Sequence, residues 1–202
     1  IRDSPNVPFL FAKLDIKDGF WRLAVNDEDA WNFTYVLPTL KPVSSLDELE
    51  LVVPNSLQMG WCESPPLFCS ASETARDIIV ALLEEDLPSH PLEDIMLQAL
   101  QNKRLHGHAT TAHCPPRLLS LLEVYVDDFI GLTNDCRPEK LRHLSRAMLH
   151  GIHAIFPPPA VTGHCGADPI SESKLSKGEG TWEETKEILG WLFDGKHYTV
   201  QL

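Results

Sequence analysis

Basic residues are scarce in this chain of 202 residues: 17 Lys and Arg stand against 29 Asp and Glu, for a formal net charge of −12. Proteins that bind nucleic acid usually carry a surplus of Lys and Arg for the phosphates, so this chain alone lacks the charge for a broad phosphate-binding surface. The sequence also lacks an apolar run long enough to span a bilayer, and its first ten residues lack the charged-then-apolar order of a signal peptide. We therefore expect an intracellular, soluble protein, in the nucleus or the cytoplasm, with no membrane contact.

Cysteine is sparse, and its spacing suggests no disulfide framework. The five cysteines include no Cys-x-x-Cys pair, and their odd number predicts reduced thiols. Cys62 and Cys69 flank Ser64, but no histidine and carboxylate stand at a spacing that suggests nucleophilic catalysis. Four potential zinc ligands lie close together: His106, His108, His113 and Cys114. Without a second closely spaced ligand pair, a polar loop is the preferred interpretation of this cluster over a zinc knuckle.

The hydrophobic content of 43% allows one substantial core, and we expect a single domain over residues 1–202. Apolar and β-branched segments predict strands at residues 9–14, 31–37, 49–53, 118–124, 129–132, 188–193 and 198–202. Helical spacing predicts one helix opened by Ser64 as N-cap with Pro65, and a second running from Pro138 to the proline run 157–159. Residues 84–117 are expected to form a peripheral insertion with a weak helix at 92–100, and residues 163–180 a loop. This order predicts an α+β fold: an antiparallel sheet of split β-α-β type, covered by helices on one face.

Carboxylates stand at two of the predicted strand ends. Asp127 and Asp128 follow Tyr125-Val126 between two apolar segments, where a hairpin tip is expected, and Asp15 ends the strand at 9–14. An ordinary acidic turn would also explain Asp127 and Asp128, since Asp is a common turn residue. If the strand ends lie side by side, however, they offer the hard oxygen ligands that Mg²⁺ prefers. Two such ions, roughly 3.5–4 Å apart, can activate an attacking 3′-hydroxyl and stabilise a pyrophosphate leaving group.

Four segments resemble conserved motifs of reverse transcriptases, in the order that this family has them. Residues 15–21 (DIKDGFW) resemble motif A, residues 57–66 (LQMGWCESPP) motif B, residues 125–128 (YVDD) motif C, and residues 186–191 (KEILGW) the motif E hairpin. Within the family, the residues of these motifs are most similar to those of eukaryotic retrotransposon polymerases. The resemblance implies the palm domain of an RNA-directed DNA polymerase, a nucleotidyltransferase that adds dNTPs to a DNA primer on an RNA template with two Mg²⁺ ions, or Mn²⁺ in their place.

The resemblance also implies three sets of site residues. The catalytic metal set is Asp15 and Asp127 as principal ligands, Asp128 as supporting carboxylate and the carbonyl of Ile16. The nucleotide-binding set is Asp18, Gly19, Phe20, Met59 and Gly60, with Phe20 as a steric gate that favours dNTPs over rNTPs. The primer-grip set is Leu189, Gly190 and Trp191. Lys174 and Lys177 are both candidates for the lysine of motif D, whereas Gln58 and Met59 depart from the residues common in motif B.

Members of this family also carry a fingers segment before motif A, and a thumb and an RNase H domain after motif E. The chain begins fourteen residues before Asp15 and ends at Leu202, so we expect these parts to be absent from it and to come from flanking polypeptide. A second hypothesis is therefore a catalytically inactive retroelement remnant, or a domesticated interaction module, that retains the palm fold.

Overall fold

The computed structural model describes residues 7–38, 45–104, 118–159 and 167–202. Contacts within the chain divide it into two compact units, one of residues 1–17 with 69–202 and the other of residues 18–68. Helix α2 (Ser64–Leu82) begins in the smaller unit and continues in the larger one. Small antiparallel sheets combine with helices, so the described chain is α+β at a coarse level. The single-domain expectation stays a prediction.

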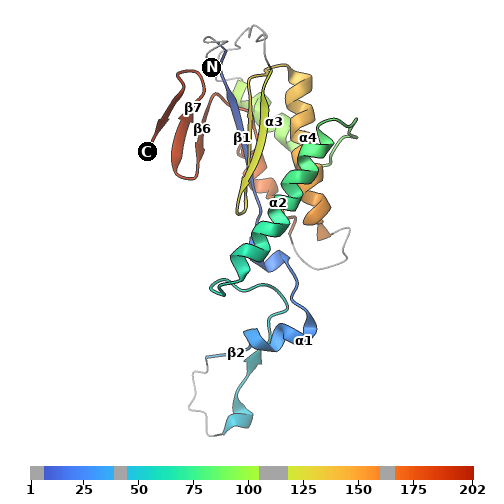
Figure 1. Cartoon of the computed structure of the whole chain (residues 1–202), viewed down its shortest axis with the longest axis vertical. Helices are drawn as coiled ribbons and strands as arrows, with labels where there is room; N and C mark the ends of the chain where they lie inside the picture. The colour runs from blue at the N-terminus through green and yellow to red at the C-terminus, as the bar shows by residue number, and fades with distance from the viewer. Residues whose placement is uncertain (1–6, 39–44, 105–117, 160–166) are drawn as a thin grey trace. The chain divides into compact units, whose positions relative to one another are not determined.

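The larger unit contains a three-stranded sheet of β1 (Leu10–Asp15), β5 (Asp128–Thr133) and β4 (Ser120–Tyr125), in that order (Figure 1). Both β1 and β4 are antiparallel to β5, so they run parallel to each other with β5 between them. The predicted strands at residues 9–14, 118–124 and 129–132 are confirmed, with ends shifted by one or two residues.

Strand register gives this sheet one buried face and one open face. Leu14 lies opposite Phe129 and Ala12 opposite Gly131, and these residues are buried. Because side chains alternate along a strand, the residues between them, such as Lys13, point to the other face. The open face is therefore the one on which charged side chains can remain in contact with water.

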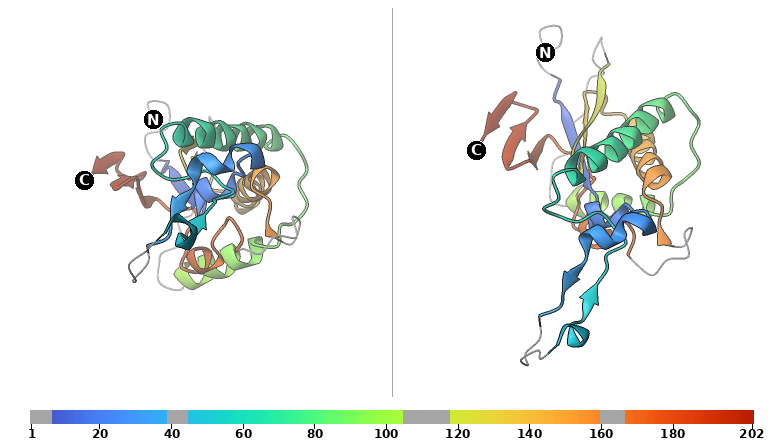
Figure 2. Two further views of the ribbon diagram at one scale, coloured as in Figure 1. Left: turned by 90° about the horizontal axis from the view of Figure 1, so that it is seen from below. Right: turned by 60° about the horizontal axis from the view of Figure 1, so that its bottom comes forward.

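Helix α4 (Pro138–Ile155) and α2 pack closely beside each other over the buried face (Figure 2). A Cβ added at Gly151 of α4 would collide with Cγ1 of Ile79 of α2 and lie 3.1 Å from its backbone nitrogen. Trp182 adds to this cover, since its indole N–H donates to the hydroxyl of Ser145 at 2.9 Å and its ring lies against Gly131. Both helices were predicted at these positions, and the buried stripe of α4 confirms its predicted spacing.

Ser64 is the first residue of α2, but it does not act as the predicted N-cap. Its hydroxyl donates a hydrogen bond of 2.7 Å to the carbonyl of Gln58, so its side chain ties the helix to the preceding loop. The helix nevertheless begins at the predicted place, because Pro65 and Pro66 are tolerated in a first turn, where amides lack intrahelical partners.

Helix α3 (Glu93–Arg104) packs against the short helix α6 (Glu172–Ser176) in the larger unit (Figure 2). Leu92, Met96 and Ala99 are buried, so this segment contributes to the core of the unit. Whether residues 84–117 are an insertion stays a prediction. The expectation that residues 163–180 form only a loop is wrong for α6, which is too short to show the repeated apolar spacing of a helix.

The last three strands, β6 (Thr185–Ile188), β7 (Trp191–Asp194) and β8 (Thr199–Gln201), form a separate antiparallel sheet in that order. Leu189 and Gly190 join β6 to β7 with positive φ angles of 53° and 78°, as a type I′ turn requires. The predicted strand at 188–193 is therefore interrupted by a turn. The predicted strand at 198–202 is confirmed as β8, which pairs with β7, and between these strands the Asp194 carboxylate accepts backbone N–H bonds from Lys196 and His197.

The smaller unit contains helix α1 (Asp27–Ala30) and a two-stranded sheet of β2 (Tyr35–Val36) and β3 (Leu51–Val52). Short 3-10 helices span Gly19–Arg22, Trp31–Phe33 and Leu46–Glu48. The prediction of a strand over residues 31–37 is wrong in its first half. The Asn26 side chain caps α1 by accepting from the amide of Glu28 at 3.3 Å, and the helical backbone continues through Phe33 despite its aromatic composition.

Within the described segments, no helix combines the length and the apolar character that crossing a membrane requires.

Candidate functional site

The end of β1 and the β4–β5 hairpin bring the three predicted aspartates together. Asp15, the last residue of β1, lies opposite Asp128, the first residue of β5. The amide of Ile16 donates to the carbonyl of Asp127 at 3.1 Å. Val126 and Asp127 form the two-residue turn between β4 and β5, with a φ of 56° at Val126. Residues 112 positions apart in the chain thus meet at one end of the sheet.

Two lysines lie against these carboxylates. The ammonium of Lys174, on α6, donates to Oδ1 of Asp15 at 2.6 Å and also to Oδ2 of the same residue. The ammonium of Lys13 lies 2.9 Å from Oδ1 of Asp128. Lys13 precedes Asp15 by two residues on β1, so strand alternation places both on the open face. Each of these two aspartates therefore has a cationic partner.

Glu179 adds a fourth carboxyl group to this end of the sheet. Burial, together with the hydrogen bond to Asp15 and the charge of Asp15, raises the pKa of Glu179 to about 7. Burial alone would raise the pKa of Asp15, but the hydrogen bonds with Glu179 and Lys174 and the lysine charges lower it below its ordinary value. Near neutral pH, Glu179 is therefore partly protonated and can donate to an ionised Asp15.

Asp127 has a different environment from the other two aspartates. Burial and the charges of Asp128 and Asp15 raise the pKa of Asp127 above its ordinary value. Among the described residues, none forms an ion pair with its carboxylate. Asp127 is thus a half-buried acid beside two like charges with no counter-charge of its own.

The chemistry of this donor set fits a divalent cation. Carboxylate oxygens suit Mg²⁺ and Mn²⁺, and a cation would supply the counter-charge that Asp127 lacks. Among the described residues, no three His, Cys, Asp or Glu side chains converge on one point; Mg²⁺, however, is usually held by one or two carboxylates together with waters and substrate phosphates. Residues that would hold the ion are Asp15, Asp127, Asp128 and the carbonyl of Ile16. The histidine-rich cluster that allowed a zinc interpretation (residues 106–114) lies outside the described residues.

The predicted nucleotide-binding residues lie together in the smaller unit. Asp18 has a left-handed backbone (φ 61°) and precedes the 3-10 helix that contains Gly19 and Phe20, without a capping hydrogen bond from its side chain. A Cβ at Gly19 would lie 3.1 Å from Cζ of Phe68, and the rings of Phe20 and Phe68 are 5.0 Å apart, so Phe20 is partly packed against α2. The amide of Leu57 donates to the carbonyl of Leu23 at 2.9 Å, which holds the loop of motif B beside this segment.

Within that loop, Met59 is 69% exposed and Gly60 has a φ of 94° with open space where a Cβ would stand. A glycine is favoured at this backbone conformation. The metal set and the nucleotide-binding set thus come together separately, each within its own unit.

The predicted primer-grip residues form the exposed β6–β7 turn. Leu189 and Trp191 are 45% and 43% exposed, and Gly190 completes the turn. A hollow of about 420 Å³ lies between this turn and the sheet, lined among others by Lys13, Lys177, Glu179 and Gly190. Because Lys13 is the partner of Asp128, the hollow connects the turn with the carboxylate end of the sheet.

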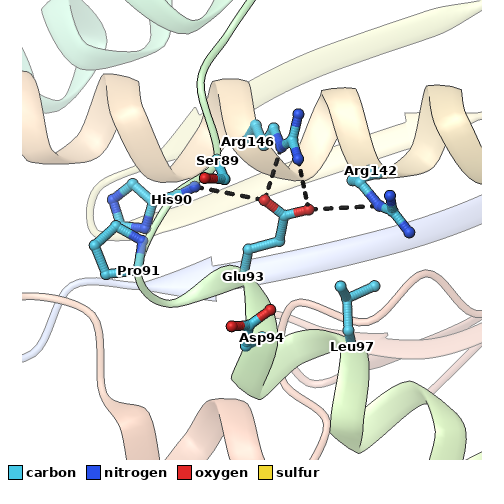
Figure 3. A pocket seen from close by; sticks show the side chains of 8 residues that line it. All are labelled: Ser89, His90, Pro91, Glu93, Asp94, Leu97, Arg142 and Arg146. Carbon is cyan, nitrogen blue, oxygen red and sulfur yellow. Dashed lines mark hydrogen bonds and ion pairs between the residues drawn. The ribbon is translucent and has the colours of Figure 1, made fainter.

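A second hollow, of about 430 Å³, surrounds Glu93 (Figure 3). Both oxygens of Glu93 are bound there, by Nε and Nη2 of Arg146 at 2.7 and 3.1 Å, with Arg142 at 3.4 Å from Oε1. None of the predicted site residues lines this hollow among the described residues. We interpret it as a structural ion-pair network that joins α3 to α4.

Sequence reasoning missed two residues of the carboxylate site. Lys13 could have been found, because strand alternation places it on the face of Asp15. Glu179 gave no signal, since it lies in a segment expected to be loop and reaches Asp15 only through the fold.

No protein-family model matches this chain, and no curated protein matches it significantly.

Proposed function

We propose that this chain is the palm of an RNA-directed DNA polymerase, which adds dNTPs to a DNA primer on an RNA template by nucleotidyl transfer with two divalent ions. The observation that carries the proposal is the meeting of Asp15 with Asp127 and Asp128 at adjacent strand ends. These are the positions that the resemblance to motifs A and C assigns to metal ligands.

The topology of the sheet supports the same proposal. Strands β1 and β4 are parallel, α2 and α3 lie between them in the chain, and β5 is inserted between them in the sheet. This strand order is compatible with the split β-α-β arrangement expected of a palm. Helices cover one face, and the aspartates lie at the end of the other.

In this proposal Asp15 and Asp127 are the principal ligands, with Asp128 and the Ile16 carbonyl in support. Bound Mg²⁺, or Mn²⁺, would activate the primer 3′-hydroxyl and stabilise the departing pyrophosphate. Of the two lysine candidates for motif D, Lys174 is favoured because it contacts Asp15, whereas Lys177 lines the hollow beside the β6–β7 turn.

The remaining assignments follow from motifs A, B and E. Phe20 would crowd a ribose 2′-hydroxyl, and Asp18 and Gly19 would present backbone amides to the triphosphate. Met59 and Gly60 would lie beneath the nascent base pair, and the exposed turn at Leu189, Gly190 and Trp191 would contact the primer end.

The negative charge of the chain limits how much nucleic-acid binding it can provide. Lys13, Lys177 and Lys186 line the hollow beside the primer-grip turn, but three glutamates line it as well, so the hollow provides little surplus positive charge. With a net charge of −12, the rest of the phosphate-binding surface would come from flanking polypeptide or another chain.

Primer extension tests the proposal directly. The 202-residue chain is incubated with a DNA primer on an RNA template, dNTPs and Mg²⁺ or Mn²⁺. We expect metal-dependent extension, and a loss of more than about 100-fold in Asp127→Asn, because a lost ligand removes several kcal/mol of transition-state stabilisation. Phe20→Ala should retain dNTP incorporation and increase the incorporation of rNTPs relative to dNTPs. A folded sample that extends no primer with either metal ion would refute polymerase activity for this chain.

The second candidate is an inactive remnant or interaction module that keeps the palm fold. It is favoured by the two ion pairs that already neutralise Asp15 and Asp128, and by the net charge of −12. Under this alternative the chain unfolds cooperatively but neither extends a primer nor binds divalent ions. The same extension assay, with an unfolding curve for the same sample, separates the two candidates.

A further inference from the structure

Both carboxylate oxygens of Asp15 are bound by one ammonium group. Lys174 donates to Oδ1 at 2.6 Å and also to Oδ2, and the Asp15 side chain is only 16% exposed. A lysine ammonium is a compact point charge with three donors, so it occupies the space in front of a carboxylate much as a bound cation does. A metal ion cannot use these oxygens fully while the ammonium remains.

Part of the negative charge at this end of the sheet is already offset without any ion. The ammonium groups of Lys13 and Lys174 stand against three aspartates and the neighbouring Glu179, and among the described residues Asp127 has no ion-pair partner. A divalent ion added to this set would meet two nearby positive charges. Its binding is therefore opposed unless one lysine moves away.

Lys174 is the lysine that can move. Its side chain is 50% exposed and belongs to α6, a helix of five residues, so it can turn into solvent without disturbing a strand. Lys13 is less exposed and stands within the β1–β5 ladder, opposite Ile130. Each lysine pairs with one aspartate, but the side chain of Lys174 can move away from its partner more easily than that of Lys13.

We infer that Lys174 is an internal counter-ion of the carboxylate site, which holds Asp15 in the ion-free protein and competes with divalent cations for it. This inference rests on the proposed metal site. The ammonium holds the Asp15 side chain in place, and it leaves Asp15 when a divalent ion binds. Lys174 thereby sets the concentration of Mg²⁺ at which the site fills. It is a positioning residue that acts through Asp15 and lowers the affinity of the site for Mg²⁺.

Calorimetric titration with MgCl₂ at pH 8.0, above the pKa of about 7 of Glu179, tests the inference. Lys174→Gln should bind Mg²⁺ more tightly than the wild type, on the order of tenfold, because the change removes a positive charge that repels the divalent ion and frees both oxygens of Asp15. Lys177→Gln is the matched control: it removes the same charge three positions away, and no ion pair joins Lys177 to an aspartate among the described residues. Its affinity should stay within about twofold of the wild type, because screened surface charges contribute little. Unfolding curves verify that each variant is folded.

Two results would overturn the inference in different ways. Equal affinities for Lys174→Gln and Lys177→Gln, or weaker binding by Lys174→Gln than by the wild type, would show that Lys174 does not compete with the ion. Such a result would leave the metal site itself intact. If neither the wild type nor any variant binds Mg²⁺ or Mn²⁺ at millimolar concentrations, the proposed function fails and the inference falls with it.

Discussion

The ion pair between Glu93 and Arg146 offers a sharp test of how α3 is attached to α4. Glu93 is 5% exposed, and both of its oxygens bind the guanidinium of Arg146, at 2.7 and 3.1 Å (Figure 3). Arg146→Met keeps most of the aliphatic stem but leaves a buried carboxylate without its main partner. Helix α3 packs against α6, which holds Lys174, so the pair also supports the carboxylate site.

The expected magnitude follows from burial. Removing one partner of a buried ion pair costs about 3–5 kcal/mol. We expect about 3 kcal/mol for Arg146→Met, at the lower end of that range, because the Arg146 side chain is 26% exposed and Arg142 remains 3.4 Å from Glu93. For a protein of this size, that corresponds to a lowering of Tm by about 6–12 °C.

Urea denaturation followed by circular dichroism at pH 7 measures the effect. Arg142→Met is the matched control, since this arginine lies one turn away on α4 and contacts the same carboxylate, but its side chain is about half exposed. Its cost should stay below about 1 kcal/mol. In the double variant Glu93→Gln/Arg146→Met, the loss should be smaller than the sum of the two single losses by more than about 1 kcal/mol.

The effect should also depend on pH. Burial acts to raise the pKa of Glu93, but hydrogen bonds and charge from Arg146 lower it below its ordinary value of 4.5. The stabilisation is therefore present above pH 4.5 and is lost as the pH falls through the pKa of the folded state. Equal stability of Arg146→Met and Arg142→Met at pH 7 would refute the interpretation of this network.

Two further changes test the packing and the acid response. Gly151→Ala should destabilise the protein by about 1–3 kcal/mol in urea, because the new Cβ would collide with Ile79; Ala154→Ser adds one atom to the exposed side of α4 and should cost less than about 0.5 kcal/mol. Burial and the adjacent His153 lower the pKa of His90 to about 4, so stability should fall with pH between 6.5 and 4, by up to about 1.4 kcal/mol per pH unit. His90→Gln should flatten this slope in acid-titrated unfolding curves, and an unchanged slope would contradict the assignment.

Local sequence patterns were sufficient for the elements that carry the aspartates. Apolar segments on both sides of Asp127-Asp128 predicted the β4–β5 hairpin, and prolines marked the beginning of α2 and α4. The backbone conformation of the turn could not be predicted from its residues, because Val126 is β-branched and such residues rarely adopt a positive φ. Pairing across the whole hairpin overrides that local preference.

Other features depend on contacts between distant residues and could not be predicted. Glu179 and Lys174 meet Asp15 only because α6 lies beside β1, and no periodic pattern marks so short a helix. The aromatic residues after α1 suggested a strand, but the cap at Asn26 starts a helical backbone that continues through Phe33. After Asn26 a local interaction of one side chain, and not average composition, determines the backbone, whereas the place of Lys174 beside Asp15 depends on contacts between distant segments.

The central claim is that Asp15, Asp127 and Asp128 act together as one centre for divalent cations. Electron paramagnetic resonance of Mn²⁺ titrated into the chain at pH 8.0 counts bound ions directly. The wild type should bind Mn²⁺, and Asp127→Asn should lose at least one bound ion, while a change outside the site, Ala154→Ser, should leave the count unaltered. Absence of bound Mn²⁺ in the wild type at millimolar concentrations, or an identical count in Asp127→Asn, would contradict the claim.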